Sequence, residues 1–421
     1  MKIKDIVTLT TTSITPQSNE EYHLYSLPSF DDNQKREELI GSEIQSNKYT
    51  VPDKCILFNK LNVRFKRVWR IDNNDYNKIC STEFLPLVVN ESKVDYQYCY
   101  YILISDYITN YLCGQNANTS GSHKRIDPTD FLNIELPTLP AMEEQKRIGQ
   151  LLFSLDQKIA LNRAINDNLE AMAKQLYDYW FVQFDFPNEE GKPYKSSGGK
   201  MVWSEELQMN IPHNWVICRL NDYIDKNNTG DWGNDTPSNN SIEVGCIRGA
   251  DILKLNNLPR RYIKKNNIAK LLSDWDMVIE VSGGSPTQAT GRSALITPGT
   301  IKRNGGKITC SNFCHAFSFK SYKYSAFFFF AWKMFYVNDI MFNYEGKTSG
   351  IKNFMTETFL ANKWVMPKQE LVDRFFEQIR SIYSQIDANI AENNHLTKQR
   401  DELLPLLMNG QVSVNYHLSH D

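Results

Sequence analysis

The sequence predicts an α+β protein in which two similar β-rich globular domains are each followed by one long helix. Three observations lead to this prediction. A helical pattern with heptad spacing occurs twice, and equivalent positions such as Asn162 and Asn393 lie 231 residues apart. Short sequences ahead of the two patterns resemble each other, and the remaining stretches have the alternating apolar and polar residues typical of strands.

The first helical pattern begins near Glu143, shortly after Pro140. Acidic residues at this end suit the positive end of a helix dipole. Residues along one side follow alternating spacings of four and three, which is the seam of a coiled coil over about four heptads. The seam residues are Ile148, Leu152, Leu155, Ile159, Asn162, Asn166, Leu169, Ala173 and Leu176.

The second pattern repeats the first at equivalent positions. Its seam residues are Ile379, Tyr383, Ile386, Ile390, Asn393, Thr397, Arg400, Leu404 and Leu407. Polar residues match as well, since Asp156 corresponds to Asp387 and Asn162 to Asn393. An Asn within a seam costs stability but fixes the register of the helices. Two unrelated amphipathic helices are the alternative explanation.

The domain boundaries follow from these helices and from turn-forming residues. Residues 184–187 should end the first helix, and Pro405 and Gly410 should end the second. The Gly-, Ser- and Pro-containing stretch between helix and domain predicts a linker. The expected parts are a domain at 1–140, a helix at 141–186, a linker at 187–212, a domain at 213–366, a helix at 367–412 and a tail at 413–421.

Both domains also begin alike, because residues 3–7 (IKDIV) resemble residues 220–224 (LNDYI). A Gly-containing polar loop precedes each helix, at residues 120–125 and 349–353. In the first domain, residues 63–70 alternate in a way that predicts a strand with Arg64, Lys66 and Arg70 on one face.

Composition places the chain among soluble cytoplasmic proteins. It has 421 residues, 41% of them apolar, and the longest apolar run, at 326–332, is too short to span a membrane. The N-terminus lacks the apolar core of a signal peptide, and the eight scattered cysteines fit reduced thiols. We therefore expect no membrane partner.

The net charge of −2 hides an uneven distribution. Residues 213–363 contain 19 basic and 12 acidic side chains, a balance of +7. Residues 1–135 contain 15 and 18, residues 136–212 contain 8 and 11, and residues 364–421 contain 5 and 8, a balance of −3 each. Since local positive faces attract phosphate, the total charge neither requires nor excludes a nucleic-acid partner.

No catalytic or metal centre is apparent. Lys347 and Thr348 end like a phosphate-binding loop, but Met341 replaces the glycine that such a loop requires. Cys310, Cys314 and His315 lack a fourth ligand at suitable spacing, so a partly buried thiol pair is favoured over zinc. None of the sixteen prolines is followed by another, whereas an adenine methyltransferase is expected to have a Pro-Pro pair in its catalytic loop.

The helical regions resemble a known family. Residues 173–182 (AKQLYDYWFV), 184–187 (FDFP), 191–203 (GKPYKSSGGKMVW) and 211–215 (IPHNW) are similar to the central conserved region of type I restriction–modification specificity subunits. Residues 400–410 (RDELLPLLMNG) resemble the motif that closes the second conserved region of that family. Departures are small, such as Gln183 where an acidic residue is more usual.

The resemblance implies a non-catalytic subunit that binds double-stranded DNA. Each globular domain would be a target recognition domain that reads one half of a bipartite site. The two helices would pack antiparallel as a coiled-coil spacer and would dock two methyltransferase subunits. S-adenosylmethionine, ATP and Mg²⁺ would bind to the methyltransferase and restriction–translocase subunits, and this chain would bind no cofactor.

Candidate DNA contacts are basic or polar residues near aromatic residues or glycines. Such side chains bind phosphate, and Arg can also read guanine. A solvated strand face or ordinary turn is the alternative for each. The candidates are Lys60, Arg64, Lys66, Arg70, Ser122, His123, Lys124 and Arg125 in the first domain, and Arg260, Arg261, Lys264, Lys265, Arg292 and Lys352 in the second.

Two other classes of function remain open at this stage. One is a stand-alone DNA-modifying enzyme, against which the missing catalytic motifs count. The other is a coiled-coil scaffold whose domains bind protein or glycan. A strong dependence of binding on salt would separate DNA binding from the scaffold function.

Overall fold

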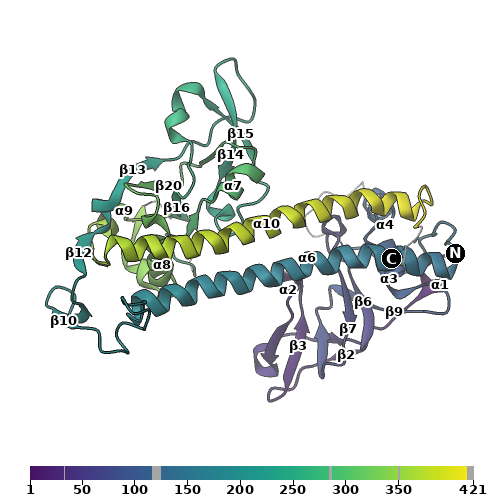
Figure 1. Cartoon of the computed structure of the whole chain (residues 1–421). Helices are drawn as coiled ribbons and strands as arrows, with labels where there is room; N and C mark the ends of the chain where they lie inside the picture. Colours follow the sequence, from purple (N-terminus) through teal and green to yellow (C-terminus); the bar gives the residue numbers. More distant parts are fainter. Residues whose placement is uncertain (33, 116–124, 284–286, 349–350, 415–421) are drawn as a thin grey trace, which may run out of the picture. The chain divides into compact units, whose positions relative to one another are not determined.

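The computed structural model describes the chain except for residues 33, 116–124, 284–286, 349–350 and 415–421 (Figure 1). The described chain forms two units. Unit 1 comprises Met1–Ala160 and Asn394–Asp421, and unit 2 comprises Leu161–Asn393. The two long helices, α6 (Met142–Tyr177) and α10 (Gln369–Met408), contribute residues to both units.

The two helices are antiparallel, as expected. In unit 2, Asn162 Nδ2 donates to Asn393 Oδ1 at 3.0 Å, and Asn389 Nδ2 donates to Asn166 Oδ1 at 2.8 Å. A higher residue number on α6 is thus paired with a lower one on α10. Within unit 1, Arg400 of α10 donates to Asp156 of α6 at 2.8 Å.

The predicted seam residues are less exposed than residues on other sides of the helices. Every seam residue named above is buried or half-buried, whereas Leu161 and Met172, which lie off the seam of α6, are 56% and 55% exposed. Asn162 is only 2% exposed, and its amide also donates to Glu392. Because Asn162 and Asn393 are equivalent in the repeat and contact each other, the two helices are related by a local twofold rotation at this point.

Unit 1 contains two sheets. The first has the strand order β1-β9-β6-β7 with antiparallel neighbours, and the second has the order β2-β5-β8-β3-β4, in which β3 and β8 are parallel. The strands are β1 (Val7–Leu9), β2 (Ser13–Ile14), β3 (Glu21–Tyr25), β4 (Glu37–Ile40), β5 (Lys48–Thr50), β6 (Lys54–Asn59), β7 (Val68–Asp72), β8 (Lys78–Cys80) and β9 (Phe84–Val89). The helices are α1 (Ile3–Ile6), α2 (Leu27–Asp31), α3 (Tyr96–Ile104), α4 (Asp106–Gln115) and α5 (Pro128–Leu132).

Unit 2 contains a corresponding pair of sheets, with the orders β13-β20-β16-β18 and β15-β14-β19. Their strands are β13 (Ile224–Thr229), β14 (Ser241–Ile247), β15 (Arg260–Lys264), β16 (Met277–Glu280), β18 (Ser293–Leu295), β19 (Ile308–Cys310) and β20 (Cys314–Phe319). Shorter pairings involve β10 (Met201–Ser204), β11 (Met209–Pro212), β12 (Val216–Arg219), β17 (Ser282–Gly283), β21 (Glu345–Thr348), β22 (Ile351–Phe354) and β23 (Lys363–Met366). The helices are α7 (Pro298–Arg303), α8 (Tyr324–Val337) and α9 (Thr356–Leu360).

The strand orders show that both units have the same topology. In the order across each sheet, β1, β9, β6 and β7 correspond to β13, β20, β16 and β18, and each set forms one antiparallel sheet. The parallel pair β3–β8 corresponds to β14–β19, which is also parallel. The prediction of two similar β-rich domains is therefore confirmed at the level of strand pairing.

The similar sequences at the start of each domain fold alike. The N–H of Lys2 donates to Asp5 at 2.7 Å, and the N–H of Arg219 donates to Asp222 at 3.0 Å. Each Asp thus caps a short helical turn that leads into the edge strand of its sheet. The shared Asp is the reason that residues 3–7 and 220–224 look alike.

The described segments that follow the two long helices are also ordered. Residues 187–212, expected to form a linker, contain the hairpin of β10 and β11, and the ring of Phe186 is stacked on that of Tyr194 at 4.6 Å. Gly410 has a φ of 67° and follows the end of α10, as a C-terminal cap requires. Within the described residues, none of the helices is both long and apolar enough to cross a membrane.

Candidate nucleic-acid interface

The same end of the first sheet is built identically in both units. In unit 1, the N–H of Lys60 donates to Glu83 O, and the N–H of Ile126 donates to Lys60 O, both at 2.9 Å. In unit 2, Val281 takes the place of Lys60. The N–H of Val281 donates to Phe313 O at 2.8 Å, and the N–H of Phe354 donates to Val281 O at 2.7 Å. The loop after the central strand and the segment before the last short helix are therefore brought together in each unit.

This arrangement joins candidates that are far apart in the sequence. Lys60 and Arg125 lie together at this end of the first sheet in unit 1, because Leu61 and Arg125 form a β-bridge. Arg125 is 58% exposed in its side chain and makes a two-pronged ion pair with Glu83 at 2.7 Å. Ser122, His123 and Lys124 lie outside the described residues.

The prediction of a strand over residues 63–70 is wrong in its first half. Asn62 and Lys66 have positive φ values of 53° and 44°, and a 3-10 turn, Val63–Phe65, lies between them. Left-handed residues interrupt a strand, so β7 begins only at Val68. Arg64 is exposed in this turn, and Lys66 pairs with Asp106 at 2.6 Å.

Arg70 faces the interior of unit 1. Its guanidinium carbon lies 4.7 Å from the ring centre of Tyr100 and 4.1 Å from that of Phe153 on α6. Such contacts are favourable cation–π interactions. A DNA contact by Arg70 would require its side chain to leave both rings.

On β15 of unit 2 the basic residues are divided between two faces. Arg260 and Lys264 are exposed together with the half-buried Tyr262, and Lys265 follows them on the surface. Arg261 points the other way and is 7% exposed. It lies 4.2 Å from the ring centre of Trp232 and donates to the carbonyls of Trp232 and Gly233, so it holds the 232–233 loop.

The two remaining candidates of unit 2 are also engaged. Arg292 makes a two-pronged ion pair with Glu280 at 2.7 Å, and the two side chains are only 15% and 7% exposed. Lys352 pairs with Glu345 at 2.9 Å and lies 5.1 Å from the ring centre of Phe342. Both basic residues therefore stabilise the loops that carry them.

Sequence reasoning missed a group of neighbouring surface residues formed by Trp232, Asn312 and Phe313. The N–H of Trp232 donates to Asn312 Oδ1 at 2.9 Å, and Phe313 O accepts from the N–H groups of Val281 and Ser282. Phe313 is nevertheless 58% exposed. An exposed ring on a fixed backbone is suited to stacking against a base. An aromatic residue in the short turn between two strands was the available signal.

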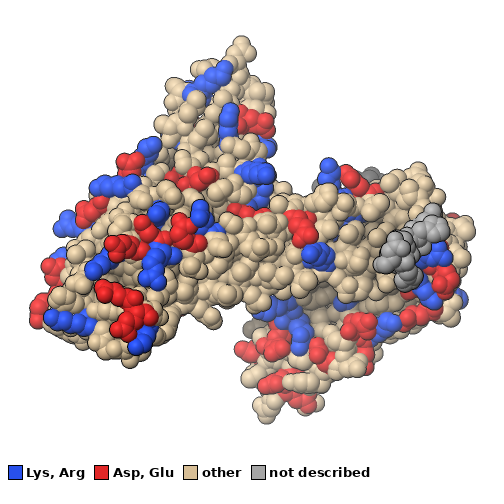
Figure 2. Space-filling model, in the orientation of Figure 1, with Lys and Arg blue, Asp and Glu red and all other residues tan. Residues whose placement is uncertain are grey.

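Figure 2 shows that Lys and Arg side chains are interspersed with Asp and Glu on the face it presents. The area over β14 and β15 has more basic than acidic residues, in line with the excess of seven positive charges at 213–363. Positive charge of this kind attracts the phosphate backbone without specifying bases.

Comparisons with known proteins agree with this architecture. The family model of the type I restriction modification DNA specificity domain matches residues 1–171. The type I restriction enzyme MjaIX specificity subunit of Methanocaldococcus jannaschii is 22% identical over 355 residues, covering 80% of this chain and 74% of that protein. The HindI specificity subunit of Haemophilus influenzae is 23% identical over 420 residues, covering 85% and 86%. Over most of its length the chain is thus similar to type I restriction–modification specificity subunits.

The fold of this chain also has a solved counterpart. It is similar to the crystal structure of the type I restriction–modification system S subunit from M. genitalium. The match includes 97% of this chain and 95% of that chain. The TM-score is 0.53 at 14% sequence identity. At this identity the likeness concerns the fold alone.

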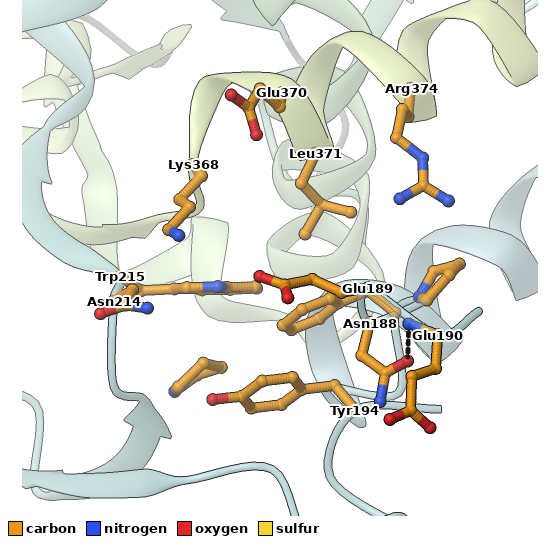
Figure 3. Close-up of a pocket in the computed structure, with 13 residues that line it drawn as sticks. Asn188, Glu189, Glu190, Tyr194, Asn214, Trp215, Lys368, Glu370, Leu371 and Arg374 are labelled. Atoms are coloured by element: carbon orange, nitrogen blue, oxygen red, sulfur yellow. Dashed lines mark hydrogen bonds between the residues drawn. The ribbon is translucent and has the colours of Figure 1, made fainter. Parts of the chain in front are cut away.

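Unit 2 has an aromatic pocket, shown in Figure 3, with a volume of about 420 Å³. Phe186 lies between Tyr194 and Trp215, with ring centres 4.6 and 5.4 Å away. Leu371 and Arg374 of α10 point toward these rings from the opposite wall. An apolar centre with a charged rim is the composition of a protein-binding surface.

The thiols of unit 2 have a structural environment. Cys310 and Cys314 are both buried, as the sequence predicted, and burial raises the pKa of Cys314 to about 11. A protonated thiol is a poor metal ligand and nucleophile. Burial also lowers the pKa of His315, which keeps that ring neutral. Within the described ranges, no group of three or more His, Cys, Asp or Glu residues is placed to hold a metal ion.

Replacing Lys264 with Ala should weaken binding of the chain to DNA without changing the preferred sequence. A lysine that contacts phosphate releases about one counterion, so the slope of log K against log salt should decrease by about 1. Lys200→Ala, at an exposed position near the β10–β11 hairpin, is the control. An unchanged slope for Lys264→Ala would show that Lys264 does not contact a DNA phosphate.

Proposed function

We propose that this specificity subunit directs methylation and restriction to one bipartite DNA sequence, with each unit reading one half of it. The observation that carries the proposal is the repeated topology of the two units, each containing one domain and sections of both helices. Two reading domains on stiff helices suit a target whose halves are separated by about one turn of DNA.

The end of the first sheet that carries the loop after the central strand is the proposed reading surface in each unit. It contains Lys60 and Arg125 in unit 1 and Phe313 with Trp232 in unit 2. Loops held by fixed backbone hydrogen bonds can present side chains to base edges with little loss of entropy on binding. The exposed residues Arg260 and Lys264 would bind phosphate beside this surface.

The helices and the aromatic pocket are the proposed docking surface for two methyltransferase subunits, and restriction–translocase subunits would join that complex. S-adenosylmethionine would bind to the methyltransferase subunits, and ATP with Mg²⁺ to the restriction–translocase subunits. This chain would take no part in the chemistry, in keeping with its similarity to specificity subunits.

The test is an exchange of residues 1–135 for the corresponding domain of a relative. The complex of the hybrid chain with the methyltransferase should methylate a sequence in which only one half has changed, because each domain reads its own half-site. Genome-wide mapping of methyladenine gives the answer. The chain without its partner is the control and should show no methylation. A change in both halves, or in neither, would contradict the proposal.

A further inference from the structure

The two long helices each have one aspartate at an equivalent position, and both aspartates bind a globular domain. Asp156 on α6 and Asp387 on α10 correspond in the repeat. Their side chains are 18% and 15% exposed, although they lie at positions beside the seam rather than in it. Carboxylates are rarely this buried unless they accept hydrogen bonds, so their partners are informative.

Asp387 receives three different donors from α7 and its N-cap residue, Thr297. Arg303 Nη1 donates to Oδ1 at 2.6 Å, and Thr297 Oγ1 donates to the same oxygen at 2.9 Å. The N–H of Gly299 donates to Oδ2 at 3.1 Å. Thr297 is 3% exposed, and Arg303 also donates to Leu255 O deeper in the domain. The carboxylate therefore ties α10 directly to the interior of the second domain.

The approach of α7 to Asp387 is as close as a backbone allows. A Cβ atom on Gly299 would lie 2.2 Å from the carboxyl carbon of Asp387, which is far inside van der Waals contact. Any larger residue at position 299 would therefore force the Asp387 side chain to move.

Asp156 binds the first domain through a different element. The hydroxyl of Tyr101 on α3 donates to Oδ2 at 2.6 Å, and Arg400 of α10 donates to Oδ1 at 2.8 Å. Tyr101 is completely buried. Burial raises the pKa of Tyr101, so its hydroxyl keeps the proton that it donates.

The aspartate that accepts the hydrogen bonds is thus the same in both helical repeats, whereas the groups that donate to it differ between the two domains. From its domain, Asp156 accepts a hydrogen bond from the hydroxyl of Tyr101 on α3. Asp387 instead accepts hydrogen bonds from a backbone N–H, a threonine hydroxyl and an arginine at α7. The two domains share a topology but differ in sequence, and each is hydrogen-bonded to the equivalent aspartate of a long helix. A general packing requirement would not select the same carboxylate twice with unlike donors.

We propose that Asp156 and Asp387 are positioning residues that fix each domain along its helices and so set the number of base pairs between the two half-sites. This proposal rests on the proposed bipartite target. Loss of a hydrogen bond to a charged group changes an equilibrium by about tenfold or more. A domain that is less firmly held should accept half-sites at neighbouring spacings while still reading the same bases.

The experiment uses the complex with the methyltransferase and a set of DNA duplexes whose gap is varied by one base pair in either direction. Asp387→Asn should raise methylation at the neighbouring gaps by about tenfold relative to the native gap, because the charge that holds Arg303 is lost. The half-site sequences should not change. Asp167→Asn, an exposed aspartate of α6, is the matched control and should keep the strict gap.

Thr297→Val is the second variant if Asp387→Asn does not fold. It keeps the Asp387 charge and the shape of the side chain, and it removes the hydroxyl that donates to Asp387 and caps α7. It should relax the gap in the same direction but less. A strict gap in a folded Thr297→Val or Asp387→Asn variant, or an altered half-site sequence, would overturn the proposal. A wild-type complex whose target is not bipartite would instead contradict the proposed function itself, before any variant is compared.

Discussion

Duplicating one heptad in each long helix is expected to lengthen the gap of the DNA target by about 1–3 base pairs. The segments to duplicate are residues 155–161 of α6 and 394–400 of α10. Seven residues add about 10 Å of helix, and one base pair occupies about 3.4 Å along the DNA. The range extends below three because the helices need not run parallel to the DNA axis.

The contacts between the helices explain the choice of segments. Asp156 faces Arg400 within unit 1, and Asn162 faces Asn393 within unit 2. Residues 155–161 therefore lie opposite residues 394–400, and duplication of both repeats their pairing. A full heptad also keeps the seam on the same side of each helix.

Methylation mapping measures the outcome, and the two half-site sequences should remain unchanged. Duplication in α6 alone is the control, because Asp156–Arg400 and Asn162–Asn393 can no longer form together. That variant should lose most of its methylation-directing activity. Full activity at the original gap in the double-duplication variant would show that these helices do not set the spacing.

Breaking the buried ion pair of unit 2 is expected to destabilise that unit by about 3–5 kcal/mol. Arg292→Met leaves Glu280 without its cation in a site where the carboxylate side chain is 7% exposed. The unfolding free energy can be followed by tryptophan fluorescence, since every tryptophan except Trp69 lies in unit 2.

A second variant separates the two roles considered for Arg292. Arg292→Met combined with Glu280→Leu removes both charges, and replacing a buried pair by apolar residues is often close to neutral. We expect the double variant to regain most of the lost stability and to direct methylation to the same target. A stable double variant that fails to read one half-site would instead identify Arg292 as a DNA contact.

The long helices could be predicted from the sequence because their contacts are local and periodic. A seam at spacings of four and three appears directly in the order of residues, so the buried side of α6 and α10 was evident. The matched residues Asn162 and Asn393 also revealed the repeat, and they proved to contact each other. Family motifs in the same regions pointed to the specificity subunits.

The positions of the basic side chains were decided by the tertiary structure. Arg70, Arg261 and Arg292 have the same charge and similar neighbours in sequence as exposed candidates such as Arg64. Each nevertheless packs on aromatic rings or a buried carboxylate. Burial of an arginine depends on partners distant in the chain, which local sequence does not reveal.

The sequence by itself therefore determined the repeated plan, the two helices and their seam, because each depends on residues within a few turns of one another. The tertiary structure decided which candidates share an edge, that Asp156 and Asp387 hold the domains, and that Phe313 is exposed. These features arise from strand pairing and side-chain contacts across tens to hundreds of residues. Their energies depend on which surfaces meet in the folded chain, so local periodicity does not encode them.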